Sequence, residues 1–190
     1  MPFLADTGLR IGEAAALRWK DIDVSAGTVH VRETFVEVRG TATVNQPKTK
    51  AGRRVVPMLT DEVGARLQGR AERLSLGSED YVWRGEDGGV LRPRLFRRRV
   101  WKPALEIAGL DDPQPTPHSL RHTAVAHWIA AGVTDRLKLM RLAGHQSTAI
   151  IDTIYGHLLP FETTEERAAL SAMRAAAVAK AGPRHLRVVS

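Results

Sequence analysis

Residues suited to binding an anion concentrate in the segment Thr116–Trp128, which reads TPHSLRHTAVAHW. Thr116 followed by Pro117 predicts a helix start, because threonine serves as the N-cap and proline fits the first helical position. His118 then falls in the first turn, and Arg121 follows three residues later on the same face. The helix N-terminus adds unpaired N–H groups and partial positive charge, which suit a phosphate. The plainer interpretation is that His118 caps the helix and Arg121 is an exposed helical arginine.

His118 and His122 stand four residues apart, a spacing that can also hold a metal ion. The H-E-x-x-H pattern of zinc enzymes is absent, and no carboxylate stands suitably near in the sequence. The chain has no cysteine, which excludes disulfides, thiolate metal sites, iron–sulfur clusters and a cysteine nucleophile. We therefore expect neither a metal ion nor a cofactor.

Two other segments hold residues that have both a functional and a plain interpretation. In LAGHQSTAIIDTIYGHL, His145 follows a helix-ending Gly144, and Tyr155 comes ten residues later. Tyr155, one of two tyrosines, is either an aromatic anchor of the core or a nucleophile, since a phenol can attack phosphorus. In TGLRIGEAAALRW, Arg10 stands at a helix start, and its plain interpretation is an exposed pair with Glu13 worth a few tenths of a kcal/mol.

The positive charge is concentrated in one stretch. The net charge is +7, and residues 92–102 (RPRLFRRRVWK) hold six basic and no acidic residues. At helical spacing, Leu95, Phe96, Val100 and Trp101 are expected to dock one face while the arginines point outward. Such a stretch suits the phosphate backbone of a nucleic acid better than it suits a plain solvated helix or a membrane surface.

The elements that must position these residues are mostly helical. Residues 22–58 alternate in polarity and are rich in β-branched residues, with a turn at Arg39-Gly40, which predicts a small antiparallel sheet of about three strands. Helices are expected before Gly8 and over residues 11–19, 61–74, the basic stretch, 117–131, 134–143, 148–155 and 162–180. The fold class is therefore α+β, mostly helical with one small three-stranded sheet.

The composition favours a soluble protein of the cytoplasm. Hydrophobic residues make up 43% and charged residues 26% of the chain, ordinary values for a globular protein. No apolar run approaches the ~20 residues of a membrane span. The first residues, MPFLADTGLR, lack the basic region of a secretion signal.

Four segments, taken together and in this order, resemble the phage-integrase family of tyrosine site-specific recombinases: TGLRIGEAAALRW, PKTKAGRRVVPM, HSLRHTAVAHW and LAGHQSTAIIDTIYGHLLP. The resemblance runs from about residue 4 to residue 160 and implies the catalytic-domain fold of these DNA breaking-rejoining enzymes. It also implies six catalytic residues: Arg10, Lys48, His118, Arg121, His145 and Tyr155. Lys50 is the alternative to Lys48, because the hairpin loop offers two lysines within three residues.

The chemistry that the resemblance implies agrees with these residue types. Two arginines can hold the non-bridging oxygens of a phosphate and stabilise its pentacoordinate transition state. Tyr155 must lose its proton on attack, with His118 as the candidate base, and Lys48 could protonate the leaving 5′ oxygen. His145 could donate a hydrogen bond to the phosphate. A 3′-phosphotyrosine ester conserves the bond energy, so rejoining needs no ATP, and the arginines replace a metal ion.

The expected partner is double-stranded DNA, together with further copies of the chain. Family members assemble into a tetramer on two sites, and the helix of residues 162–180 is expected to dock onto a neighbouring protomer rather than its own domain. The residues expected to contact DNA are Lys50, Arg53, Arg92, Arg94, Arg97, Arg98, Arg99 and Lys102.

We expect one catalytic domain over residues 1–182 and a loose tail over 183–190. Family members usually carry an N-terminal core-binding domain, and Met1 stands only nine residues before Arg10, so we expect an N-terminally truncated chain that binds DNA weakly and with strong salt dependence. Two other functions stay open: strand relaxation like that of a type IB topoisomerase, and a DNA-binding remnant without catalysis. H-x-x-R-H and YGHL resemble a recombinase more than a topoisomerase.

Overall fold

The computed structural model describes residues 2–38, 41–47, 52–110, 112–159 and 164–181. Internal contacts divide the chain into two units, Met1–Leu158 and Leu159–Ser190. The domain boundary expected after residue 182 stays a prediction. The described part of the second unit is the helix α9 (Thr164–Ala181), close to the bounds expected from the sequence. None of the helices in the described ranges is long and apolar enough to cross a membrane.

The first unit opens with the two short helices that carry Arg10. Helix α1 (Pro2–Thr7) ends at Gly8, as expected, and α2 spans Ile11–Ala15. Gly8 has a φ of +62°, and a Cβ there would lie 2.9 Å from the Trp128 ring, so only glycine fits this position. The expected helix over residues 11–19 is too long, because the backbone N–H groups of Trp19 and Lys20 donate to carbonyls of residues 78–80 instead of continuing the helix.

The strands form two sheets rather than one. Strands β1 (Ile22–Asp23), β2 (Thr28–Val31) and β5 (Arg54–Pro57) form an antiparallel sheet in the order β1-β2-β5. Strands β3 (Thr34–Val38) and β4 (Thr41–Asn45) form a second, two-stranded antiparallel sheet. A three-stranded sheet is thus present, but the alternating run over residues 28–38 breaks into β2 and β3. At the break, Arg32 and Glu33 form ion pairs with Asp21 and Arg18, and alternation alone cannot reveal such a break.

Helices account for most of the remaining first unit, as expected. They are α3 (Asp61–Leu74), α4 (Pro93–Phe96), a π-helical turn (Arg97–Trp101), α5 (Lys102–Ile107), α6 (Pro117–Ala130), α7 (Arg136–Ala143), α8 (Thr148–Tyr155) and a 3₁₀ turn (Gly156–Leu158). The Ser147 cap of α8 is confirmed, whereas α7 is capped by Asp135, whose carboxylate accepts from the Lys138 N–H, and not by Thr134.

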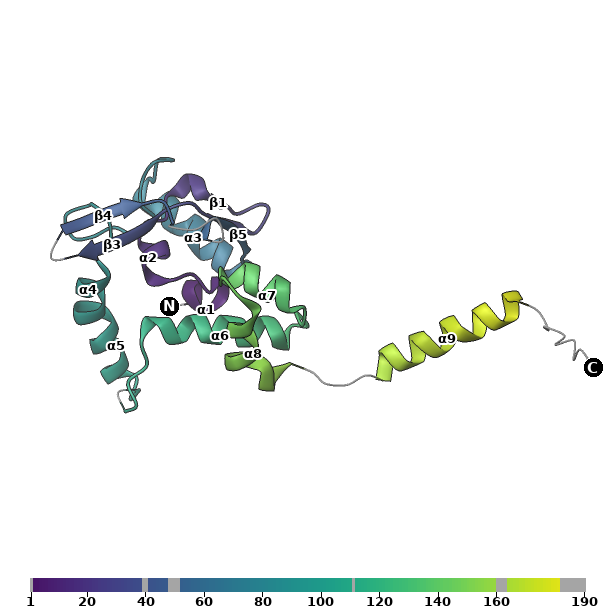
Figure 1. The fold of residues 1–190 in the computed structure, drawn as a ribbon. Helices are drawn as coiled ribbons and strands as arrows, with labels where there is room; N and C mark the ends of the chain where they lie inside the picture. The colour runs from purple at the N-terminus through teal and green to yellow at the C-terminus, as the bar shows by residue number, and fades with distance from the viewer. Residues whose placement is uncertain (1, 39–40, 48–51, 111, 160–163, 182–190) are drawn as a thin grey trace, which may run out of the picture. The chain divides into compact units, whose positions relative to one another are not determined.

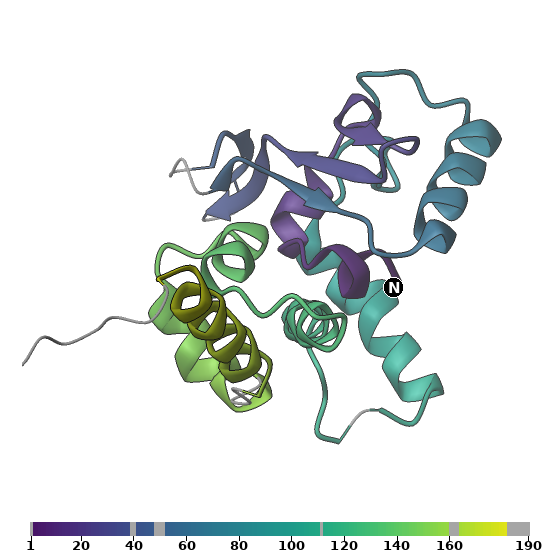
Figure 2. The ribbon, with the colours of Figure 1, turned by 90° about the vertical axis from the view of Figure 1, so that its right-hand side faces the viewer.

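The core of the first unit forms where α6 packs against α1. Trp128 of α6 is fully buried, and its indole N–H donates to the Asp6 carbonyl of α1. Leu4 and Leu9 of the N-terminal segment are also fully buried. Figure 1 places the strands above α6, with α7 and α8 toward the end of α6 that lies away from α5; Figure 2, which views α6 almost along its axis, again places the strands above it. This arrangement brings the starts of α2 and α6 close to the end of α7.

Candidate active site

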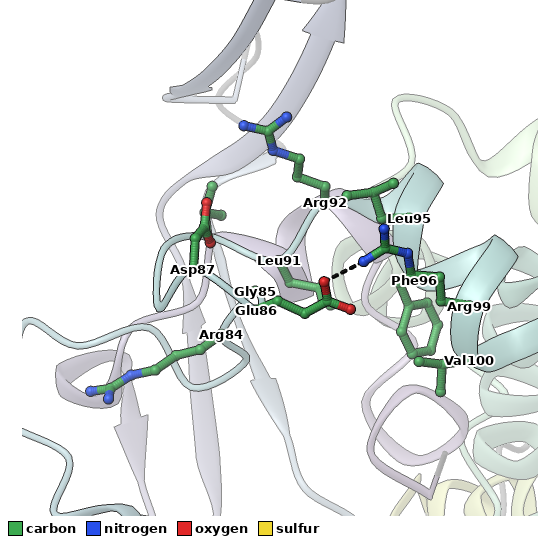
Figure 3. A pocket seen from close by; sticks show the side chains of 11 residues that line it. Arg84, Gly85, Glu86, Asp87, Leu91, Arg92, Leu95, Phe96, Arg99 and Val100 are labelled. Atoms are coloured by element: carbon green, nitrogen blue, oxygen red, sulfur yellow. Dashed lines mark hydrogen bonds and ion pairs between the residues drawn. The ribbon is translucent and has the colours of Figure 1, made fainter.

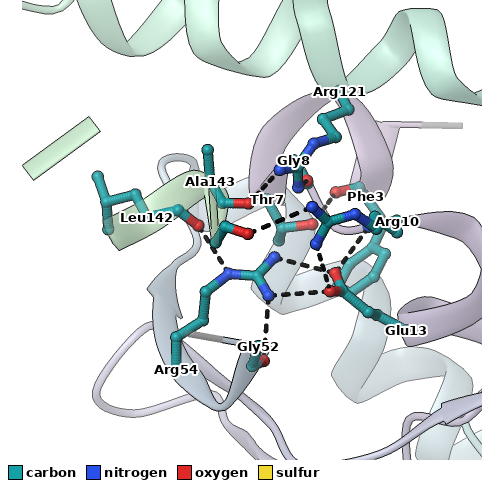
Figure 4. Close-up of polar contacts among 11 residues, drawn as sticks. Phe3, Thr7, Gly8, Arg10, Glu13, Gly52, Arg54, Arg121, Leu142 and Ala143 are labelled. Carbon is teal, nitrogen blue, oxygen red and sulfur yellow. Dashed lines mark hydrogen bonds and ion pairs between the residues drawn. The ribbon is translucent and has the colours of Figure 1, made fainter. Parts of the chain in front are cut away.

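Three successive carbonyl groups at the end of α7 each accept a hydrogen bond from a different arginine (Figure 4). The pairs are Arg54 Nε with Leu142 O at 2.8 Å, Arg121 Nη2 with Ala143 O, and Arg10 Nη2 with Gly144 O at 3.2 Å. The last carbonyls of a helix lack partners within the helix and carry partial negative charge, so cations are favoured there. The end of α7 thereby gathers side chains from α6, β5 and the start of α2.

Arg121 is the most deeply buried of the three arginines. The residue is 1% exposed, and its Nη1 donates to the Gly8 carbonyl at 2.7 Å. Its interpretation as an exposed helical arginine is therefore wrong. Burial lowers the pKa of the Arg121 guanidinium to about 10, and the charge of Arg10 adds to this effect. The guanidinium remains protonated at neutral pH, so a fixed positive charge lies inside the site.

Glu13 joins two of the arginines through one buried carboxylate. Arg54 donates to both of its oxygens at 3.0 and 2.9 Å, and Arg10 donates through its backbone N–H at 2.8 Å and Nη1 at 3.0 Å. Burial raises the pKa of the Glu13 carboxyl, but the hydrogen bonds and charge of Arg54, with those of Arg10, outweigh it and hold the pKa below its ordinary value. The Arg10–Glu13 pair expected from the sequence is present, with Glu13 buried rather than exposed.

His145 directly follows the cluster. Gly144 has a φ of +64°, and this turn closes α7 through a bond from the His145 N–H to the Met140 carbonyl. Burial lowers the pKa of His145 to about 4, helped by the charges of Arg121, Arg10 and Arg54. The imidazole is therefore neutral at pH 7. Its Nδ1 atom is buried and has no hydrogen-bond partner among the described residues.

Tyr155 lies at the end of α8 and contacts an unexpected partner. The residue is 3% exposed, and its hydroxyl oxygen lies 2.7 Å from Nδ1 of His122. Burial raises the pKa of the Tyr155 phenol, and the charge of Arg121 offsets part of this rise. Tyr155 is thus packed in the core, as one interpretation held, while its hydroxyl makes a polar contact that an apolar anchor does not need.

His118 lies at the second position of α6 and is exposed. Its ring meets the ring of His122 edge-on, with the centroids 5.1 Å apart. Burial of part of the ring lowers the pKa of His118, and the nearby His122, Arg121 and Arg10 lower it further. His118 is therefore neutral at pH 7 and lies close to both arginines of the predicted site.

The structure brings together five of the six predicted catalytic residues: Arg10, His118, Arg121, His145 and Tyr155. Lys48 and its alternative Lys50 lie outside the described residues. Gly52, which follows their loop, offers its carbonyl to Arg54 Nη1 at 3.3 Å, so the end of the loop is attached to the same arginine cluster. Among the described residues, no group of three or more His, Asp or Glu side chains is placed to hold a metal ion.

Sequence reasoning missed Arg54 as part of the site and considered His122 only as a metal ligand. A signal for Arg54 was present. Arg54 and Val56 are two residues apart on one strand, so their side chains point to the same face, and Val56 is fully buried. For His122 the signal was its position one turn after His118, next to Arg121. Nothing in the sequence told which of these two histidines would reach Tyr155.

The basic stretch of residues 92–102 presents its charged side chains to solvent. All six basic residues of 92–102 are exposed, as expected, but Val100 is 53% exposed and does not dock. The π-helical turn explains this error: its five-residue spacing brings Phe96 and Trp101 to the core and turns Val100 away. Two of the cations have partners, since Arg99 pairs with Glu86 and Lys102 lies 4.0 Å from Glu106.

A pocket of about 410 Å³ lies between this stretch and the turn over residues 85–90 (Figure 3). Leu91 and Phe96 are among its apolar lining residues, and the bonded pair of Arg99 and Glu86 also lines it. None of the five predicted catalytic residues that the structure describes lines it. Arg53, the remaining described member of the expected DNA contacts, is exposed and bonded to Gln46.

Comparison with known proteins identifies relatives over most of the chain. The model of the phage integrase family matches residues 1–161. The tyrosine recombinase XerC-like protein of Caldanaerobacter subterraneus subsp. tengcongensis is 30% identical over 178 residues, which cover 83% of this chain and 44% of the relative. Prophage integrase IntR of Escherichia coli is 28% identical and covers 90% of this chain and 45% of the relative. The chain spans less than half the length of these curated relatives.

The fold is shared with solved integrases. The Tn1549 transposon integrase, solved in complex with circular intermediate DNA, aligns with a TM-score of 0.68 at 20% identity, over 90% of this chain and 57% of that chain. This likeness confirms the expected α+β fold of a recombinase catalytic domain. With a family match that covers all four segments noted in the sequence, the chain belongs to the phage integrase family.

Proposed function

We propose that this chain provides the catalytic domain of a site-specific DNA recombinase or integrase. The domain would cleave and rejoin DNA strands through a covalent 3′-phosphotyrosine intermediate. One observation carries the proposal: the end of α7 gathers Arg10 and Arg121 beside His145, and the charge of Arg121 also acts on the Tyr155 phenol and lowers its pKa. A tyrosine near such a fixed positive charge supports a reaction in which its oxygen attacks a phosphodiester.

The two arginines keep donors for a phosphate. A guanidinium has five N–H donors. Among the described residues, two side-chain N–H groups of Arg121 donate to the carbonyls of Gly8 and Ala143, and two of Arg10 donate to Glu13 and the Gly144 carbonyl. In the proposed complex the remaining donors hold the non-bridging oxygens of the scissile phosphate. These bonds to the protein fix the planes of both guanidinium groups in advance, so the site needs little reorganisation to reach the transition state.

The proposed reaction exchanges one phosphate ester for another. The Tyr155 hydroxyl gives its proton to a histidine of the site as its oxygen bonds to phosphorus, the bond to the 5′ oxygen breaks, and Lys48 gives that oxygen its proton. His145 donates a hydrogen bond to the phosphate, and His118 lies beside it. Attack by a 5′ hydroxyl of another strand reverses the step and releases Tyr155. The reaction consumes no ATP, and the arginines supply the positive charge that a metal ion supplies elsewhere.

The proposed substrate is double-stranded DNA, held in part by the basic stretch of residues 92–102. Recombination joins two sites, so we also propose a tetramer of the chain on paired DNA, in which α9 docks onto a neighbouring copy. We also propose that the protein works on DNA in the cytoplasm. Analytical ultracentrifugation on DNA, with and without residues 161–190, tests the docking; equal association of both chains contradicts it.

Covalent capture tests the proposed chemistry. The chain is mixed with nicked fragments of its genome in EDTA and quenched in SDS. We expect a protein–DNA adduct that the Tyr155→Phe variant does not form. Tyr81→Phe is the matched control, because the chain has only two tyrosines and Tyr81 is bonded to Arg18, away from the cluster. An adduct that survives Tyr155→Phe contradicts the proposal, and DNA binding without any adduct indicates the DNA-binding remnant.

A further inference from the structure

The hydroxyl of Tyr155 has a basic partner other than the one expected. The sequence pointed to His118 as the base, yet the imidazole at hydrogen-bond distance from the phenol is His122, with Nδ1 and Oη 2.7 Å apart. The two rings are 5.8 Å apart between centroids and tilted by 43°. A phenol is an O–H donor, and the Nδ1 of a neutral imidazole protonated on Nε2 is an acceptor.

The surroundings of the phenol leave few other acceptors for its proton. Tyr155 is 3% exposed, so bulk water has little access to it. The positive charge of Arg121 lowers the pKa of Tyr155 and so stabilises a phenolate, but the guanidinium of Arg121 cannot accept a proton. His122 directly follows Arg121 on α6, so the same helix supplies a fixed positive charge and a base to one oxygen atom.

His118 and His122 lie at different positions on α6 and face different groups. His118 lies in the first turn, exposed, where the helix N-terminus and Arg10 favour an anion. His122 lies one turn further in, between the His118 ring and the tyrosine. His118 therefore faces the place where a phosphate would bind, and His122 faces the nucleophile.

We infer that His122 is the catalytic base of the proposed recombinase and takes the proton of Tyr155 as the strand is cleaved. This inference rests on the proposed function. The O–H bond of Tyr155 breaks and an N–H bond forms at Nδ1 of His122, which becomes an imidazolium. In the same step the tyrosine oxygen bonds to phosphorus and the bond to the 5′ oxygen breaks, that oxygen being protonated by Lys48. On rejoining, His122 returns the proton to the tyrosine oxygen.

The test compares His122→Asn, His122→Ala and His118→Asn with the unchanged chain on a DNA fragment that it captures. Asparagine places an amide near the position of Nδ1, so it keeps a hydrogen bond to the phenol but cannot take a proton. Each variant is assayed on the natural phosphodiester and on a substrate with sulfur in place of the 5′ bridging oxygen. Sulfur leaves as a thiolate without a proton, so this substrate bypasses the acid and reports on the nucleophile alone.

We expect His122→Asn and His122→Ala to form the adduct about 100-fold more slowly or worse on both substrates, the usual size of a general-base contribution. His118→Asn is expected to lose less than either His122 variant on the sulfur substrate. Adduct formation by His122→Asn within about threefold of the unchanged chain overturns the inference, because a hydrogen bond alone then suffices. A defect that disappears on the sulfur substrate overturns it as well.

Two controls separate other causes of failure. Thermal unfolding and DNA affinity of each variant are compared with those of Tyr155→Phe, so loss of folding or binding is recognised. If the unchanged chain forms no adduct with any fragment, the proposed function fails before His122 is tested. If it forms one, the His122 variants decide the inference alone.

Discussion

Removing the Arg54 guanidinium is expected to destabilise the first unit strongly. The side chain of Arg54 is 6% exposed and that of Glu13 is 4% exposed, so the two charges form a buried pair. Arg54 also satisfies the carbonyls of Leu142 and Gly52. In Arg54→Ala the Glu13 carboxylate keeps Arg10 as a partner but loses both bonds from Arg54, and the Leu142 carbonyl at the end of α7 is left without its donor.

The magnitude follows from these losses. Breaking a buried ion pair by removing one partner costs roughly 3–5 kcal/mol, and an unsatisfied buried carbonyl costs roughly 1–3 kcal/mol. Arg10 remains on Glu13 and offsets part of this, so we expect a loss of about 4 kcal/mol in the free energy of unfolding. That is a large fraction of the roughly 5–15 kcal/mol that stabilises a typical domain.

Urea denaturation at pH 7 measures this loss, with Arg66→Ala as the control. Arg66 pairs with Glu62 one turn away, but both side chains are exposed, so we expect that variant to lose at most about 0.5 kcal/mol. The double variant Glu13→Gln/Arg54→Ala should be more stable than the sum of its single changes predicts, because it removes the uncompensated charge. A loss below about 1 kcal/mol for Arg54→Ala would refute the reasoning.

Three further predictions concern the turn, the histidine and the basic stretch. Gly144→Ala should cost roughly 1–3 kcal/mol of unfolding free energy in urea, because the φ of +64° disfavours a side chain and a Cβ would lie 2.8 Å from Nη1 of Arg54; an unchanged midpoint contradicts this. Because folding lowers the pKa of His145 to about 4, protonation of this histidine favours the unfolded chain; the free energy of unfolding should therefore be highest above about pH 6.5 and fall as the pH falls toward 4. His145→Gln should flatten this part of the curve of unfolding free energy against pH. DNA binding should raise the pKa of His145 measured by NMR. Arg97→Ala and Arg98→Ala should each lower the slope of log affinity for DNA against log salt by about 0.9 for each lost phosphate contact; an unchanged slope places these residues away from DNA.

The sequence predicted the elements that carry strong local signals. The helix starts at Pro117 and Thr148 and the helix ends at Gly8 and Gly144 agree with the structure, because capping residues and glycine act within one turn of chain. The ends of α2 and β2 were missed, since both depend on partners distant in the sequence. Residues 19 and 20 bond to residues 78–80, and residues 32 and 33 pair with Asp21 and Arg18.

The same distinction holds within the site. Residue types and order indicated Arg10, Arg121, His145 and Tyr155, and the structure brings these side chains together. Their supports could not be predicted, because the carbonyls of residues 142–144 become arginine acceptors only when α2, α6 and β5 converge on α7. The choice of His122 over His118 as the partner of Tyr155 depends likewise on where α8 ends against α6.

Identification of the residue that bonds to DNA tests the central claim most directly. The SDS-resistant adduct is trimmed with nuclease and protease and analysed by mass spectrometry. We predict a nucleotide joined through its 3′ phosphate to the peptide that contains Tyr155, with the peptide containing Tyr81 unmodified. A nucleotide on any other residue, or a bond through a 5′ phosphate, would contradict the assignment of Tyr155 as the nucleophile of a DNA strand-transfer reaction.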